Sequence, residues 1–224
     1  MITIKKYDEP QINTREILRY MGCKESSEDM LALINSCLKE LSGKLTYRVC
    51  YETFDIDVPS ADSDFIEIDL GFCTCKSKGL VTNLAGCHKA IVFGATVGIE
   101  LDRLIAKYSR LSPSKALCFQ AIGAERIESL CNVFNDEVTK GCLENGLHTR
   151  PRFSPGYGDL SLDIQKDIFR VLDCSRKIGL SLNESLLMSP SKSVTAIIGI
   201  SKTPKTCKTA SCSLCSKTDC SFRR

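Results

Sequence analysis

The segment Arg150–Asp159, with the sequence RPRFSPGYGD, combines residue types that could bind a ligand. Its two prolines, Pro151 and Pro155, restrict the backbone, so little conformational entropy is lost when a ligand arrives. Gly156 and Gly158 can adopt positive φ angles and let backbone amides approach a ligand closely. The run is typical neither of a helix nor of a regular strand. It therefore predicts a stiff turn.

Arg152 and Tyr157 supply the chemistry of this turn. The Arg152 guanidinium is a planar fork of donors that suits a carboxylate or a phosphate. The Tyr157 ring offers a flat apolar face with a polar tip, which suits a purine or a sugar. A ligand with an anionic end and an aromatic end would fit both residues. A rigid surface turn with solvated arginines fits the same residues equally well, so the loop alone leaves both interpretations open.

Four cysteines gather near the end of the chain, at Cys207, Cys212, Cys215 and Cys220. Their spacing, C-x4-C-x2-C-x4-C, would let four thiolates surround one tetrahedral centre. Structural zinc usually takes two pairs separated by a longer loop, so the compact spacing favours an iron–sulfur cluster over zinc. The alternative is a disordered tail of unligated thiols.

The remaining cysteines are scattered along the chain. Most stand singly in apolar segments, where cysteine behaves as a small buried hydrophobe. Cys73, Cys75 and Cys87 could form a second site, but a fourth ligand is missing from the sequence and packing is the favoured interpretation. The first residues lack the apolar run of a signal peptide, which predicts a cytoplasmic protein. A disulfide framework is not expected in that reducing compartment.

Charge and hydropathy argue against two classes of partner. The best candidate for a membrane span is interrupted by His88 and Lys89, so we expect that the protein does not associate with a membrane. The net charge is +3, with +5 from Lys202 onward and −2 over the preceding 201 residues. A mildly acidic body without tryptophan does not offer the basic, aromatic face of a nucleic-acid-binding protein. We therefore expect no nucleic acid either.

Helical and strand patterns are mixed along the chain without a regular βαβ order, which favours the α+β class. Asn13 with Glu16, and Ser27 before an apolar helical periodicity, predict two helix starts. Proline after Ser112 begins a helix of about thirty residues, roughly 45 Å long. The expected helices are 14–21, 27–41, 99–108, 113–145 and one between Ser161 and Gly179. The expected strands are 45–54, 64–70, 89–98, 185–188 and 193–200. We expect a mixed or antiparallel twisted sheet flanked by these helices.

Two motifs carry a resemblance to a known family. The run RFSPGY at Arg152–Tyr157 resembles the R-x-x-x-G-Y signature of the activation domain of vitamin B12-dependent methionine synthase, which binds S-adenosylmethionine. The run MSPSKSVTA at Met188–Ala196 resembles the family's M-x-P-x-x-S-V-[ST]-[GA] segment, at a suitable distance downstream. The resemblance covers residues 85–200, more faintly the segment before them, and not the cysteine tail.

The resemblance implies a set of cofactor-binding residues. Arg152 would pair with the carboxylate of S-adenosylmethionine, and Gly156 and Tyr157, with the backbone near Asp159, would hold its adenosine part. An acidic residue on the preceding long helix contacts the ligand in the family. Glu128 is the best match for it, and Glu125 is the neighbour with which it could be confused. No catalytic side chain is implied, because the protein positions an electrophilic methyl group rather than supplying a base.

The chain also departs from the family. Gly158-Asp159-Leu160-Ser161 stands where the large synthases have Pro-Ala-Cys-Pro, and Ile198 stands in place of an aromatic residue. Homocysteine, folate and cobalamin modules are lacking. These departures imply a stand-alone form with two parts, a S-adenosylmethionine-binding activation-type domain at 1–201 and a basic cysteine-rich tail at 202–224.

Such a chain would support reductive methylation of cob(II)alamin on a separate methionine synthase or corrinoid protein. It would be an activation component of a methyltransferase, acting in trans, rather than a complete enzyme. The electron could come from a cluster on the tail or from a separate donor. Two alternatives stand: an iron–sulfur or zinc redox and docking protein whose body is only a scaffold, and an ordinary S-adenosylmethionine-dependent methyltransferase with a small acceptor.

Overall fold

The computed structural model describes residues 1–23, 26–59 and 67–204. The cysteine tail, with Cys207, Cys212, Cys215 and Cys220, lies outside these ranges. The elements follow one another in the order β1 (Thr3–Tyr7), α1 (Thr14–Tyr20), α2 (Glu28–Leu41), β2 (Tyr47–Asp55), β3 (Glu67–Asp69), β4 (Thr74–Lys76), α3 (Lys78–Leu84), β5 (Cys87–Thr96), α4 (Glu100–Leu111), α5 (Pro113–Glu144), β6 (His148–Thr149), α6 (Ile164–Leu172), α7 (Cys174–Ile178), β7 (Ser181–Leu182), β8 (Met188–Ser189) and β9 (Ser193–Ser201).

A five-stranded sheet in the order β1-β2-β5-β9-β6 forms the centre of the molecule. Every neighbouring pair is antiparallel, and β5 pairs with β9 so that Val92 lies opposite Ile197. Strand β9 is rich in β-branched residues, which suit a pleated and buried surface. The predicted α+β class, with an antiparallel sheet flanked by helices, is confirmed.

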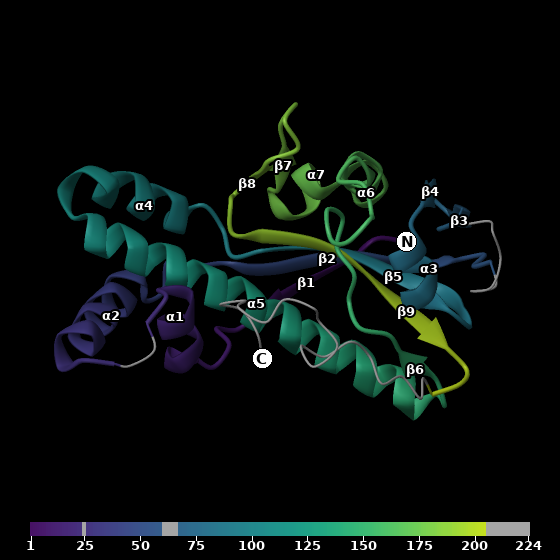
Figure 1. The fold of residues 1–224 in the computed structure, drawn as a ribbon, viewed down its shortest axis with the longest axis horizontal. Helices are drawn as coiled ribbons and strands as arrows, with labels where there is room; N and C mark the ends of the chain where they lie inside the picture. Colours follow the sequence, from purple (N-terminus) through teal and green to yellow (C-terminus); the bar gives the residue numbers. More distant parts are fainter. Residues whose placement is uncertain (24–25, 60–66, 205–224) are drawn as a thin grey trace.

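The sheet has a separate hydrophobic core on each face. The long helix α5, together with α1, α2 and α4, covers one face, and α6 and α7 lie across the other (Figure 1). Side chains alternate between the faces along each strand, as a strand period of two requires. Phe93 and Ile198 thus point into the α5 core, whereas Val92 and Ile197 point into the core under α6 and α7. The sheet positions residues for both layers.

Helix α5 is the longest element, with 32 residues or about 48 Å. Pro113 lies in its first turn, where the missing amide hydrogen costs nothing. Its buried face includes Phe119, Ile122 and Phe134, and Gly146, with a φ of +68°, follows its C-terminus. The helix runs along the sheet (Figure 1). Two of its polar side chains, Asn132 and Thr139, form hydrogen bonds with Arg152 and with Thr149 of β6.

Three expectations about the elements were wrong or incomplete. The single helix expected before Gly179 is two helices, because Asp173 between them has a left-handed φ of +47°. The strand expected at 185–188 is mostly a turn, and only Met188 belongs to a strand, β8. Several short elements were missed, namely α3, β4, β6, β7 and the edge strand β1, although β1 pairs along its whole length with β2.

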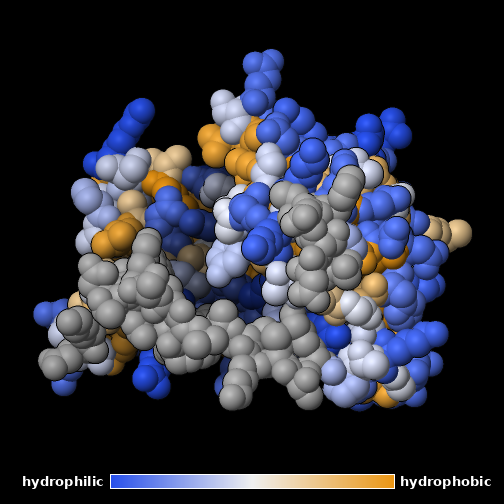
Figure 2. Space-filling model, turned by 45° about the vertical axis from the view of Figure 1, so that its right-hand side comes forward, coloured by the Kyte–Doolittle hydropathy of each residue, from blue (hydrophilic) through white to orange (hydrophobic). Residues whose placement is uncertain are grey.

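The surface is predominantly polar on the face seen in Figure 2, where hydrophobic residues form small, separate patches. Within the described ranges, no helix is long and apolar enough to span a membrane.

Candidate functional site

The predicted turn is attached to the edge of β9. Phe153 and Ile197 exchange both backbone hydrogen bonds, each 2.9 Å long. The amide of Arg150 donates to the carbonyl of Gly199 at 2.8 Å. The chain after β6 therefore continues the ladder along β9, and Arg152 lies between two fixed points of it.

Arg150 has a structural role. It is only 4% exposed, and its Cγ packs against Gly199. Its guanidinium donates to the carbonyl oxygens of Thr203 at 3.3 Å and of Ala85 at 3.5 Å. Ala85 is the C-cap of α3, where a cation is favoured by the helix dipole. The first arginine of the segment thus ties α3 to the end of β9.

Arg152 reaches from the turn to α5. One terminal nitrogen, Nη2, donates to Oε2 of Glu128 at 2.5 Å, and the other, Nη1, donates to Oδ1 of Asn132 at 2.9 Å. Glu128 and Asn132 are four residues apart and so share one face of the helix. We call the ion pair between Arg152 and Glu128 the loop pair. It is partly open to solvent, with 22% of the arginine and 38% of the glutamate side chain exposed.

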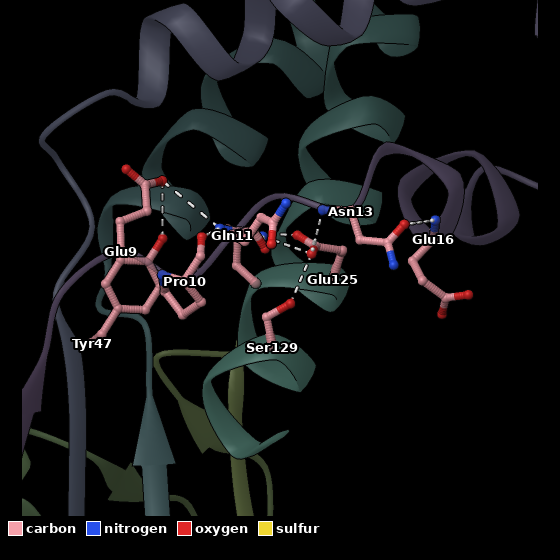
Figure 3. A network of polar contacts seen from close by, with 9 residues as sticks. Glu9, Pro10, Gln11, Asn13, Glu16, Tyr47, Glu125 and Ser129 are labelled. Carbon is pink, nitrogen blue, oxygen red and sulfur yellow. Dashed lines mark hydrogen bonds and ion pairs between the residues drawn. The ribbon is translucent and has the colours of Figure 1, made fainter. Parts of the chain in front are cut away.

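Glu125 belongs to a different network, shown in Figure 3. It forms a two-point ion pair with Arg126, which we call the buried pair, since their side chains are 2% and 0% exposed. Arg126 also donates to the carbonyls of Pro10 and Gln11. The Glu125 carboxylate accepts from Asn13 and Ser129, the donors drawn in Figure 3. Glu125 is thus committed to anchoring the segment before α1, and Glu128 is the acidic residue of α5 that meets the turn.

The glycines and the tyrosine form the tip of the turn. Gly156 and Gly158 have φ angles of +82° and +59°, which only glycine adopts readily. The Gly156 amide donates to the carbonyl of Leu160 at 2.9 Å, closing the turn. Tyr157 is 68% exposed, and its ring lies edge-on to Phe153 with 5.4 Å between the centroids. The tip therefore offers an aromatic face to an incoming molecule.

Asp159 holds the turn to α3. Its carboxylate accepts from the Ser77 hydroxyl at 2.6 Å and from the amides of Lys78 and Gly79 at 2.7 and 3.1 Å. The Ser77 hydrogen bond, together with these amides, holds the pKa of Asp159 below its ordinary value. The Asp159 side chain is thus fully used at the start of a helix, and only its backbone is left for the ligand contact that the resemblance implies. Sequence reasoning missed this role, because Ser77 is far away in the chain.

The second motif lies at the other end of β9. The Ser191 amide donates to the Asp102 carboxylate of α4 at 3.1 Å. The Lys192 stem crosses α5 where Gly123 leaves room for it, and its Nζ reaches Oε1 of Gln120 at 2.5 Å. Burial lowers the pKa of Lys192. The two motifs therefore share strand β9 and helix α5, although they are far apart in the sequence.

Of the cysteines considered for a second site, Cys75 and Cys87 are buried and Cys73 is half-buried. Burial raises the pKa of Cys73 to about 12 and of Cys75 to about 11, and Cys87 lies in the core under α6 and α7. In the described ranges, no group of three or more His, Cys, Asp and Glu side chains is placed to hold a metal ion. The proposed cysteine-tail site lies beyond these ranges.

The structure brings some of the predicted residues together. Arg152 and Glu128 are in direct contact, and Gly156 and Tyr157 form the adjoining tip. Asn132 was missed by sequence reasoning, although its position one turn after Glu128 places it on the same face. The turn thus carries a cation–anion pair with α5 and, five residues after Arg152, an exposed aromatic ring.

Comparison with known proteins gives a likeness in structure rather than in sequence. No family model matches the chain, and no curated protein matches it. A solved structure, the crystal structure of the MetH reactivation domain bound to AdoHcy, superposes with a TM-score of 0.61 at 15% sequence identity. The match covers 89% of this chain and 78% of that one. The chain therefore has the fold of the MetH reactivation domain, as the two motifs predicted.

Proposed function

We propose that the chain binds S-adenosylmethionine at the loop pair and supports reductive methylation of cob(II)alamin on a separate methionine synthase or related corrinoid methyltransferase. The observation that carries the proposal is the position of Arg152. Its guanidinium is held on α5 by Glu128 and Asn132, and the exposed Tyr157 ring belongs to the same turn. The shared fold supports the proposal, since the matching domain is described with AdoHcy bound.

In this proposal Arg152 receives the ligand carboxylate, Glu128 faces its ammonium group, and Tyr157 lies against its adenosine part. Gly156 and the backbone near Asp159 complete the adenosine contacts. S-Adenosylmethionine supplies an electrophilic methyl group, which the reduced cobalt of the partner's cobalamin accepts as a nucleophile. The side chains of this chain need only bind and orient the ligand, because holding two reactants in line removes much of the entropic cost of their encounter.

Arg152→Ala tests the proposal most directly. Loss of a charged hydrogen bond is worth about 1.5–3 kcal/mol, so we expect affinity for S-adenosylmethionine and AdoHcy to fall roughly 10- to 150-fold in titration calorimetry. Arg103→Ala is the matched control, because Arg103 is an exposed α4 arginine paired with Glu100, and its removal should leave binding unchanged. Equal affinity of the wild type and Arg152→Ala, with both folded by circular dichroism, would contradict the proposal.

Action in trans requires its own experiment. The full chain should restore activity to a cob(II)alamin-inactivated methionine synthase when S-adenosylmethionine and a one-electron donor are present, and the Arg152→Ala chain should not. The absorbance of cob(II)alamin reports the reaction. Unchanged cob(II)alamin with every corrinoid protein tried would count against a role in trans while leaving ligand binding intact.

The tail forms the second part of the proposal. We place the domain at 1–201, where β9 ends, and the cysteine-rich tail at 202–224. Four thiolates at Cys207, Cys212, Cys215 and Cys220 would hold an iron–sulfur cluster or zinc, and a cluster could deliver the electron. Protein purified without oxygen should contain iron or zinc, and its absence from such samples would refute this. The competing scaffold function predicts that Arg152→Ala leaves activity intact.

A further inference from the structure

Two buried cysteines meet on the face of the sheet that α6 and α7 cover. Cys50 of β2 and Cys174, the first residue of α7, have no exposed surface, and their sulfur atoms lie 3.8 Å apart in a thiol–thiol hydrogen bond. They are 124 positions apart in the sequence, so only the fold brings them together. A disulfide bond of about 2.05 Å needs the two sulfur atoms to approach by about 1.8 Å.

Gly94 of β5 leaves room for both sulfur atoms. It pairs with Cys50 in the ladder between β2 and β5. A Cβ atom on Gly94 would lie 3.2 Å from the Cys174 sulfur and 3.6 Å from the Cys50 sulfur. Because glycine has no such atom, the space over β5 is left to the two thiols.

We propose that Cys50 and Cys174 form a peroxide-reactive dithiol, a modification site that closes to a disulfide between β2 and α7 and is reopened by a thiol reductant. The pair is independent of the proposed function, since neither thiol belongs to the loop pair or to the cysteine tail. In a reducing compartment such a bond is transient and forms only when an oxidant is present.

With hydrogen peroxide as the oxidant, the bond forms in two steps. The Cys50 thiolate attacks one peroxide oxygen and breaks the O–O bond, which gives a sulfenic acid on Cys50 and releases hydroxide. The Cys174 sulfur then attacks the sulfenic sulfur, the S–S bond forms, and the hydroxyl group leaves with the Cys174 proton as water. The proton that Cys50 lost neutralises the hydroxide. The two thiols lose two electrons, and the peroxide is reduced to two molecules of water.

The shared hydrogen bond makes the two thiols unequal. It lowers the pKa of Cys50 and raises the pKa of Cys174. Cys50 is therefore the thiol that ionises first and attacks the oxidant, because the thiolate is the nucleophile. Cys174 is the thiol that resolves the sulfenic acid.

The buried sulfur atoms become accessible through α7. This helix has five residues and lies between Asp173 and Gly179, which have left-handed φ angles of +47° and +72°. A helix of this length is not stable by itself, so its local opening costs less free energy than global unfolding. Cys174 is its first residue and contacts Cys50, so the same opening uncovers both thiols.

The opposite face of the sheet offers an internal control. Cys37 of α2 and Cys118 of α5 are also buried and share a side-chain hydrogen bond. Their helices have 14 and 32 residues and open less readily than a five-residue helix. We expect a bond between Cys37 and Cys118 to form at least about tenfold more slowly than the bond between Cys50 and Cys174.

Mass spectrometry of the full chain tests the pair. The protein is treated with hydrogen peroxide, its remaining thiols are alkylated in denaturant, and it is digested without reduction. We expect two peptides joined through Cys50 and Cys174, which dithiothreitol separates, and a thermal midpoint raised by about 5–15 °C in the oxidised protein. Cys75→Ala changes a buried cysteine of the same core and should keep both results, whereas Cys50→Ala should lose both.

Trapping the sulfenic acid with dimedone tests the order of attack. Cys174→Ser removes the resolving thiol, and its Cys50 should be labelled at least about fivefold more than Cys174 is labelled in Cys50→Ser. Equal labelling would overturn the order. A wild type that yields no joined Cys50 and Cys174 peptides after peroxide treatment would overturn the dithiol itself. A bond between Cys37 and Cys118 that forms equally fast would overturn access through α7.

Discussion

Helix α5 carries two glutamate–arginine pairs less than one turn apart, and they have opposite surroundings. The buried pair, Glu125 with Arg126, is closed on all sides by backbone carbonyls, an amide and a hydroxyl. The loop pair, Glu128 with Arg152, joins the helix to a turn and stays partly open to water. The same chemical pair therefore has complete hydrogen bonds and a structural role in one place, whereas in the other it is partly exposed and is the pair to which we assign the proposed ligand.

The largest effect should come from breaking the buried pair. Arg126→Met leaves the Glu125 carboxylate buried without its counterion, so we expect the free energy of unfolding to fall by about 3–5 kcal/mol. Urea denaturation followed by circular dichroism measures this as a lower midpoint. Arg152→Met is the matched control at the loop pair and should cost about 1 kcal/mol or less. Similar losses in both variants would abolish the distinction between the pairs.

Asp159 tests whether exposure alone separates the two kinds of residue, because its side chain is exposed and yet holds the turn to α3. Asp159→Ala removes the acceptor for three donors at the start of α3, so we expect a loss of about 1 kcal/mol, the usual value of a helix cap. The pKa of Asp159 is lowered in the folded protein. Its contribution is therefore present above the ordinary carboxyl value of 3.8 and is lost as the pH falls through the folded pKa.

Urea denaturation of the wild type and Asp159→Ala at several pH values measures this contribution. The difference between them should be constant from pH 7 to about pH 5 and shrink below about pH 4. Asp159→Asn keeps one acceptor and should lie between them. A difference that grows on acidification would show that the carboxylate is not what stabilises α3.

The smallest effect on stability is expected at the loop pair itself. Glu128→Gln removes one partly exposed ion pair, which is worth at most about 1 kcal/mol. The thermal midpoint should shift by no more than about 2–4 °C for a chain of this size. Scanning calorimetry checks this. A shift as large as that of Arg126→Met would mean that the loop pair supports the fold rather than the ligand.

Local patterns predicted much of the fold and the centre of the site. Helix α5 follows from a sustained apolar period after Ser112-Pro113, and the turn at Arg152 follows from its glycines and prolines. The errors arose where a local sequence pattern does not determine the structure. The sequence does not show the break between α6 and α7, because an aspartate such as Asp173 can adopt a helical or a left-handed backbone conformation. Strand β1 is defined by its pairing with β2 rather than by its own sequence.

Contacts between distant segments were not predictable in the same way. The Asp159 carboxylate meets Ser77 only because the sheet brings α3 beside the turn. The resemblance favoured Glu128 over Glu125, but the sequence alone gives no physical reason for that choice, since either spacing places a carboxylate on α5. The choice is made by what packs against each face, namely the segment at Pro10 and Gln11 for one and the turn for the other.

The place of β9 in the sheet has a consequence for biosynthesis. It is the last described strand in the sequence, yet it lies between β5 and β6 and anchors the turn through Ile197. Non-local pairings of this kind form late, after the entropy of closing long loops has been overcome. A nascent chain that has emerged from the ribosome only as far as α7 already contains Glu128, Arg152 and Tyr157 but has no strand against which to hold the turn. The proposed ligand binding should therefore appear only once β9 has been synthesised.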